Sequence, residues 1–109
     1  MDHFHELFPF VKEISFSNHF EKDMKSQGLV NFDASKIFSH EFEDFTRLHK
    51  FEEKIGEHYI FRALHTGKHL VYSIDKNGKV VFLRAFSNFK EYGKFLGDKK
   101  KISEILKNK

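Results

Sequence analysis

The 109 residues are 39% hydrophobic and 32% charged and include no cysteine, which is typical of one globular domain over residues 1–109 and excludes disulfides and thiol chemistry. No stretch approaches the roughly 20 apolar residues of a membrane span, and the first residues lack a signal-peptide pattern, so we expect a soluble cytoplasmic protein without membrane contact. The net charge of +3 is unevenly divided, because residues 1–57 carry net −5 and residues 58–109 carry net +8.

The first part of the chain predicts a strand followed by a helix. "FVKEISFS" (10–17) alternates apolar and polar residues, with Phe10, Ile14 and Phe16 on one side. Ser17 or Asn18 then caps a helix that ends at Gly28.

A second helix is expected between Asp33, a candidate N-cap, and Gly56, a candidate C′ residue. Apolar residues recur there at spacings of four, three and three, which is one helical stripe. The stripe consists of Phe38, Phe42, Phe45 and Leu48. We interpret it as core packing.

From His58 onward the apolar pattern has period two and predicts strands over 58–65, 68–75 and 79–87. Thr66-Gly67 and Asn77-Gly78 fit two-residue hairpin turns. One or two helices follow, with Asp98 as a candidate cap. The order predicts an α+β domain: an N-terminal strand and two helices packed on a mainly antiparallel four-stranded sheet, with a C-terminal helix.

Two-residue turns fix the register, so each face of the three-stranded part can be listed. The face expected to pack on the helices holds Tyr59, Phe61, Ala63, Leu70, Tyr72, Ile74, Val81, Leu83 and Ala85. The opposite face, expected to be open, holds His58, Ile60, Arg62, Leu64, His69, Val71, Ser73, Asp75, Val80, Phe82, Arg84 and Phe86.

The mixture of cations, histidines and aromatics on the open face suits RNA. Arginine binds phosphate with a bidentate fork, aromatic rings stack on unpaired bases, and histidine exchanges protons near neutral pH. The basic half of the chain also favours a polyanionic partner. Two alternatives remain open. The cations can be scattered on an ordinary exposed sheet face, and the charge asymmetry can reflect an unevenly charged solvated surface.

The segment "IFRALHTGKHLVYSIDKNGKVVFLRAFSNFKEY" (60–92) resembles the C-terminal half of the RelE/ParE toxin superfamily, nearest to its RelE, YoeB and YafQ ribonuclease branches. "FRALH", "HLVYSID", "VVFLRAF" and Tyr92 carry the resemblance, and upstream "ISFSNHFEKDMK" is similar to the family's first strand and helix. The resemblance implies a RelE-like fold and the toxin of a bacterial toxin–antitoxin pair. It further implies a ribosome-associated endoribonuclease that cuts mRNA without a metal or other cofactor.

By this resemblance the site lies on the concave sheet face and the loop beside it. Arg62 then corresponds to a phosphate-binding residue, and His69 stands where an arginine is usual. His65 and Tyr92 match a histidine and an aromatic of the site, and His49 is a weaker match. Arg62, His65, His69, Arg84 and Tyr92 are therefore the expected catalytic residues. The residues expected to contact RNA are Lys68, Phe86, Asn88, Lys99, Lys100 and Lys101.

The chain departs from that pattern just after the last strand. Where the family carries a catalytic histidine, this sequence has Ser87 and Asn88, and asparagine cannot act as a general acid. Proton transfer is therefore expected from His65 or His69. The alternatives are a gyrase poison of the ParE type and a RelE-fold module that binds RNA or protein without cleavage.

The resemblance also implies partners, and the histidines of the sequence raise the possibility of a metal site. A cognate antitoxin, mRNA and the ribosome are the expected partners, and a homodimer is left open. His3 and His5 could ligate a metal, but no further ligand follows at a recognisable spacing, so we expect no metal site.

Overall fold

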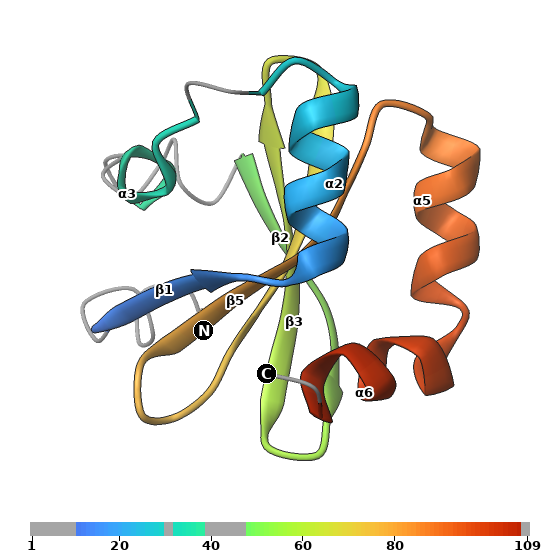
Figure 1. Cartoon of the computed structure of the whole chain (residues 1–109). Helices are drawn as coiled ribbons and strands as arrows, with labels where there is room; N and C mark the ends of the chain where they lie inside the picture. The colour runs from blue at the N-terminus through green and yellow to red at the C-terminus, as the bar shows by residue number, and fades with distance from the viewer. Residues whose placement is uncertain (1–10, 30–31, 39–47, 108–109) are drawn as a thin grey trace.

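A computed structural model describes residues 11–29, 32–38 and 48–107, apart from the side chains of residues 35 and 36. It is an α+β structure in which one sheet has the strand order β1-β5-β4-β3-β2 (Figure 1). Its elements are β1 (Glu13–Phe16), α2 (Asn18–Ser26), α3 (Ala34–Ile37), β2 (His49–Ile55), β3 (His58–His65), β4 (Lys68–Ile74), β5 (Lys79–Phe86), α5 (Phe89–Leu96) and α6 (Lys99–Lys107). No helix of the described ranges is long and apolar enough to cross a membrane.

The sheet differs from the expected four-stranded one because it has a fifth strand and is mixed. β1 pairs with β5 in parallel, and the other pairs are antiparallel. The additional strand, β2, occupies positions where the sequence pattern predicts the end of a helix, so that prediction and the role of Gly56 as a helix C′ residue are wrong. Two of the four residues of the apolar stripe, Phe42 and Phe45, lie outside the described residues, and Phe38 is buried in the core.

A bulge explains why β2 does not look like a strand in the sequence. The register shifts between Phe51 and Glu53, so Glu52 is an extra residue. Phe51 therefore contacts Phe61 on one side of the sheet, whereas Ile55 packs on the other. Strict alternation would place both on the same side, and the interrupted pattern imitates helical spacing.

The first two hairpins are tight. β2 and β3 are joined by Gly56-Glu57, with Gly56 at φ +60°. The Thr66-Gly67 turn between β3 and β4 is confirmed, with φ of 49° and 78°, which is the type I′ geometry. The β3–β4 register is accordingly as expected, and Arg62 pairs with Val71.

The third hairpin is longer than the predicted two-residue turn. Gly78 N donates to Asp75 O at 3.1 Å, and Gly78 has φ +79°, so residues 76–78 form a three-residue loop. The register shifts once more between Val71 and Tyr72, which leaves Leu83 as an extra residue in β5. The longer loop and the extra residue shift the register in opposite directions. Residues 84–86 therefore have the partners that the sequence predicts, whereas residues 79–83 lie on the opposite face from the predicted one.

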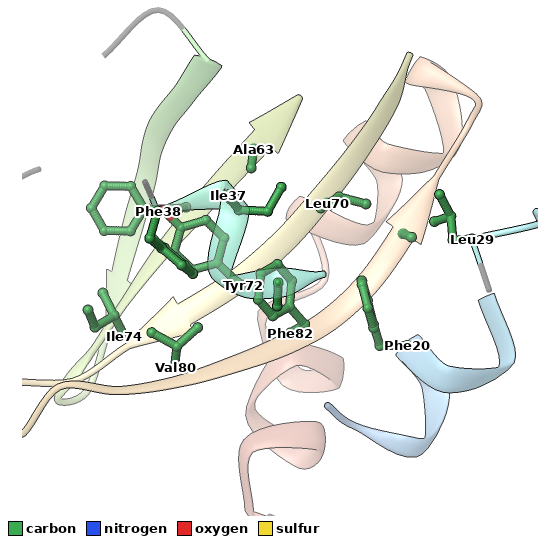
Figure 2. Close-up of a cluster of buried hydrophobic side chains, with 13 residues drawn as sticks. Phe20, Leu29, Ile37, Phe38, Ala63, Leu70, Tyr72, Ile74, Val80 and Phe82 are labelled. Carbon is green, nitrogen blue, oxygen red and sulfur yellow. The ribbon is translucent and has the colours of Figure 1, made fainter. Parts of the chain in front are cut away.

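The faces must be corrected accordingly. Val80 and Phe82 are fully buried with Tyr72 and Phe20 in the core beneath α2 and α3, which Figure 2 shows. Val81 and Leu83 lie on the opposite side. Burial of each large apolar side chain of this core contributes about 1.5–3 kcal/mol.

The opposite side of the sheet is not open, because α5 and α6 cover much of it (Figure 1). A second apolar core forms there. Its buried residues are Ile60, Val71, Leu83, Phe86, Tyr92, Phe95, Ile102 and Ile105. The two C-terminal helices thus leave only part of the expected face for function.

α2 completes the edge of β5 where β1 has ended. Ser17 is the N-cap: its hydroxyl accepts from Phe20 N at 3.0 Å and donates to Leu83 O at 2.8 Å. Asp23 accepts from Ala85 N at 2.9 Å, and Gln27 donates to Ala85 O at 2.8 Å. Side chains of one helix therefore satisfy backbone groups that a neighbouring strand would otherwise pair.

The Ser17 cap generates a stability prediction. Ser17→Ala should lower the free energy of unfolding by about 1–3 kcal/mol, because it removes a helix cap and leaves the buried Leu83 carbonyl without its donor. Urea denaturation measures the change. The adjacent Asn18→Ala is the matched control and should change stability by less than about 0.5 kcal/mol. Equal losses in both variants would contradict the assignment of the cap.

Candidate functional site

Arg62 on β3 and His69 on β4 are diagonal neighbours on the side of the sheet that carries α5. Arg62 pairs with Val71, and His69 pairs with Leu64. Neither polar residue is fully covered. This uncovered end of the sheet, beside the Thr66-Gly67 turn, unites two of the expected site residues, as the sequence predicts.

The His69 ring is fixed by two aromatic residues of α5. It stacks on Tyr92 with centroids 4.7 Å apart and planes 15° apart, and it lies 5.6 Å from Phe89. Burial lowers the pKa of His69 below its ordinary value of 6.5, and the positive charge of Arg62 lowers this pKa further. The imidazole is therefore neutral at neutral pH and can accept a proton.

Arg62 is a partly buried cation beside an acid. Its Nη1 donates to Leu48 O at 3.4 Å, and its buried Nε has no hydrogen-bond partner among the described residues. Burial lowers the pKa of Arg62 below its ordinary value, and the charge of Glu52 opposes this shift. The guanidinium remains charged and keeps a donor that no side chain of the described ranges uses.

Glu52 and Lys50 extend the site onto β2, and the sequence reasoning missed both. Lys50 pairs with Arg62 across the strands, and its Nζ lies 3.7 Å from Glu52 Oε1. Glu52 is the bulge residue, and its buried Oε2 has no hydrogen-bond partner within the described part. The error in predicting β2 as a helix concealed this contribution.

Phe89 is the third missed residue. Its side chain is 71% exposed although it contacts both His69 and Tyr92. The available signal was its spacing: residues three apart at the start of a helix share a face, so Phe89 accompanies Tyr92. Together with Leu64, which is 37% exposed, it gives the site an apolar rim.

Arg84 does not join this centre, contrary to the expectation of an open catalytic arginine. Its Nε and Nη2 donate to Asp23 at 2.6 and 3.2 Å, and its guanidinium lies over the Phe86 ring at 4.8 Å. It is on the same face as Arg62 but two strands away, at about 10 Å. The bidentate ion pair explains its presence as a link between α2 and β5.

His65 lies on the opposite side of the sheet from His69. Its ring is 5.2 Å from Phe32, which packs on the core beneath α2 and α3, and Lys68 pairs with it across the turn. The structure therefore separates His65 and Lys68 from Arg62. His49 is a buried core residue, with Nδ1 2.7 Å from the Tyr72 hydroxyl and Nε2 2.9 Å from Ile37 O.

The expected RNA-contacting residues fall into different surroundings. Phe86 is 8% exposed and packs against Phe95, so it is not available for base stacking. Asn88 caps α5 by accepting from Lys90 N and Glu91 N. Of the lysines that begin α6, Lys99 lies 3.6 Å from Glu53, and Lys100 and Lys101 are exposed.

His3 and His5 lie outside the described residues. Within residues 11–29, 32–38 and 48–107, no group of three or more His, Cys, Asp or Glu is arranged to hold a metal ion. The chemistry available at the site is thus binding of a phosphate by Arg62, proton acceptance by His69, and stacking on Phe89.

The contact between Arg62 and His69 predicts a pH response. In an NMR titration, the His69 midpoint should lie below 6.5, and Arg62→Gln should raise it without restoring 6.5, because burial still favours the neutral ring. Lys76→Gln, which removes a cation in the loop after β4, should leave the midpoint unchanged.

The lowered pKa of His69 also predicts how the stability of the fold changes with pH. The unfolded chain binds a proton at His69 near pH 6.5 and the folded chain only at lower pH, so acidification below 6.5 should destabilise the fold through this residue. A His69 midpoint at or above 6.5 in the unaltered protein would contradict the described surroundings of the ring.

The arrangement is similar to a known fold. In a crystal structure of an archaeal RelE–RelB complex from Pyrococcus horikoshii OT3, the aligned chain is 15% identical to this one, with a TM-score of 0.51. The alignment covers 70% of this chain and 93% of that chain. No protein-family model and no curated protein matches the sequence. An identity this low shows the fold alone, and the protein accordingly has a RelE-like fold.

Proposed function

We propose that this protein is the toxin of a toxin–antitoxin pair and that it cleaves mRNA at the surface formed by Arg62, His69 and Phe89. The RelE-like fold supports the toxin assignment, and the matched structure is a complex of RelE with RelB, so a cognate antitoxin is the proposed partner. The observation that carries the RNA assignment is the neutral, ring-stacked His69 next to Arg62, a cation that is only partly buried.

The proposed reaction requires one base and one cation. Neutral His69 accepts the proton of a ribose 2′-hydroxyl, whose oxygen forms a bond to the adjacent phosphorus. The bond from phosphorus to the 5′ oxygen breaks, the 5′ oxygen takes a proton from water, and a 2′,3′-cyclic phosphate remains. Arg62 neutralises the charge that develops on the phosphorane oxygens.

Phe89 supports a single-stranded substrate. An exposed aromatic ring beside a cationic centre can stack on an unpaired base, and such stacking contributes about 1–3 kcal/mol per base. A paired base in a duplex presents no free ring face. mRNA held open in the ribosome fits this requirement, which is the basis for proposing the ribosome as the place of action.

A second candidate is an RNA-binding protein of the same fold that does not cleave. Asn88, at the position where the family resemblance expects a histidine, is used as the cap of α5. The Tyr92 side chain is 4% exposed, so its ring is largely covered. These two observations reduce the number of groups that can transfer protons and favour binding without turnover.

Induction in a bacterial host, with primer extension on its mRNA, separates these candidates. We expect cleavage products with the unaltered protein and a loss of about 100-fold or more in cleavage rate for His69→Ala, because a positioned base is removed. Arg62→Gln should lose a similar factor through charge stabilisation. His65→Ala, on the opposite face, should retain cleavage. Thermal unfolding of each variant verifies that it folds.

Other outcomes would contradict the proposal. Growth arrest with intact mRNA and covalent DNA cleavage complexes would favour a gyrase poison. RNA binding that depends on Arg62 without any cleavage would favour the second candidate. Activity that is lost in His65→Ala and kept in His69→Ala would place the reaction on the other side of the sheet.

A further inference from the structure

A cavity of about 180 Å³ lies between the end of β5, α5 and the start of α6, apart from the Arg62 centre. Three cations from three elements line it: Arg84, Lys94 and Lys101. The Phe86 and Phe95 rings form its apolar wall, and Glu91 and Asp98 also line it. The proposed cleavage reaction uses none of these residues.

Arg84 is held rigidly in this cavity. Asp23 binds its Nε and Nη2, and its guanidinium lies 4.8 Å from the Phe86 centroid and 5.9 Å from that of Phe95. The described hydrogen bonds leave Nη1 unused. An arginine fixed by an ion pair and two ring faces loses little conformational freedom when it binds an anion.

Among the described residues, the two lysines of the cavity form no close ion pair. In the described ranges, neither Lys94 nor Lys101 has a carboxylate within 4.0 Å. Asp98 already accepts from Lys101 N at 3.0 Å as the cap of α6. The first turn of α6 carries lysines and no acidic residue, an arrangement that the helix dipole disfavours and that raises the positive potential at the cavity.

We propose that this cavity binds a backbone phosphate of the same RNA strand that reaches Arg62. The inference rests on the proposed function, and it adds a second phosphate subsite to the cleavage centre. Arg84 and Arg62 both pair with Val71, one strand to either side, so the two subsites share a face of the sheet about 10 Å apart. The unused Nη1 of Arg84 and the two lysine ammonium groups match phosphate better than they match an uncharged ligand.

Glu91 provides a check that the cavity binds an anion. Glu91 lines the cavity, and its negative charge would repel a phosphate bound there. Neutralising this acid should therefore strengthen binding, while neutralising the lysines should weaken it. A cavity that served only as a structural gap would show neither effect.

The direct test is an NMR titration of the ¹⁵N-labelled full chain with inorganic phosphate and, separately, with a single-stranded oligodeoxynucleotide, which has no 2′-hydroxyl and is not cleaved. We expect saturable shifts of the Lys94, Asp98 and Lys101 amides with both probes. The absence of saturable shifts there would overturn the proposal. Saturation by a glutamate-rich peptide and not by phosphate would also overturn it, in favour of a peptide pocket.

Variants then measure the contribution of the cavity. Lys94→Gln combined with Lys101→Gln should weaken oligodeoxynucleotide binding about tenfold. It should also lower the slope of log Kd against log salt by about 0.7, the contribution of one phosphate. Glu91→Gln should tighten binding. Lys107→Gln, at the far end of α6, is the matched control and should change Kd by less than the double variant does. An unchanged Kd and salt slope in the double variant would refute the subsite.

Cleavage assays separate this inference from the proposed function. At RNA concentrations below Kd, the Lys94 and Lys101 double variant should cleave more slowly than the unaltered protein, because it binds less RNA, whereas Lys107→Gln should keep the unaltered cleavage rate. Phosphate binding in the cavity of a protein that never cleaves RNA would refute the proposed cleavage and leave the subsite standing. Cleavage of RNA by a protein whose affinity does not change in the cavity variants would refute the subsite and leave the proposed cleavage standing.

Discussion

The extra residue Leu83 in β5 is the constraint on which both faces of the sheet depend. It allows one strand to place Phe82 in the core beneath α2 and Leu83 itself in the core beneath α5 and α6. A helix cap holds the bulge, since the Ser17 hydroxyl binds Leu83 O. The next residue, Arg84, is on the same face as Arg62. However, this part of β5 lies beside α2, and Asp23 of α2 binds Arg84.

The sequence was sufficient where local chemistry determines geometry. Thr66-Gly67 can adopt the positive φ angles of a type I′ turn, and that turn fixes which residues of β3 and β4 are neighbours. The proximity of Arg62 and His69 follows from this register alone. Asp98 caps α6, as its residue type suggests.

The sequence was insufficient where long-range packing overrides the local pattern. Bulges at Glu52 and Leu83 interrupt alternation, so β2 imitates a helix and half of β5 changes face. The pairing of Asp23 with Arg84 joins residues 61 apart in the chain, which no spacing rule reveals. The packing of α5 and α6 against the sheet buries Phe86, and the sequence does not reveal how these two helices are placed.

The central claim is that the end of the sheet around Arg62 and His69, and not the face beneath α2, meets RNA. The most direct measurement is a map of where a 2′-O-methyl RNA strand, which resists cleavage, protects the protein from amide hydrogen exchange. The account predicts protection at Lys50, Arg62, His69 and Phe89. Protection confined to the opposite face around Phe32 and His65, with none near His69, would contradict it.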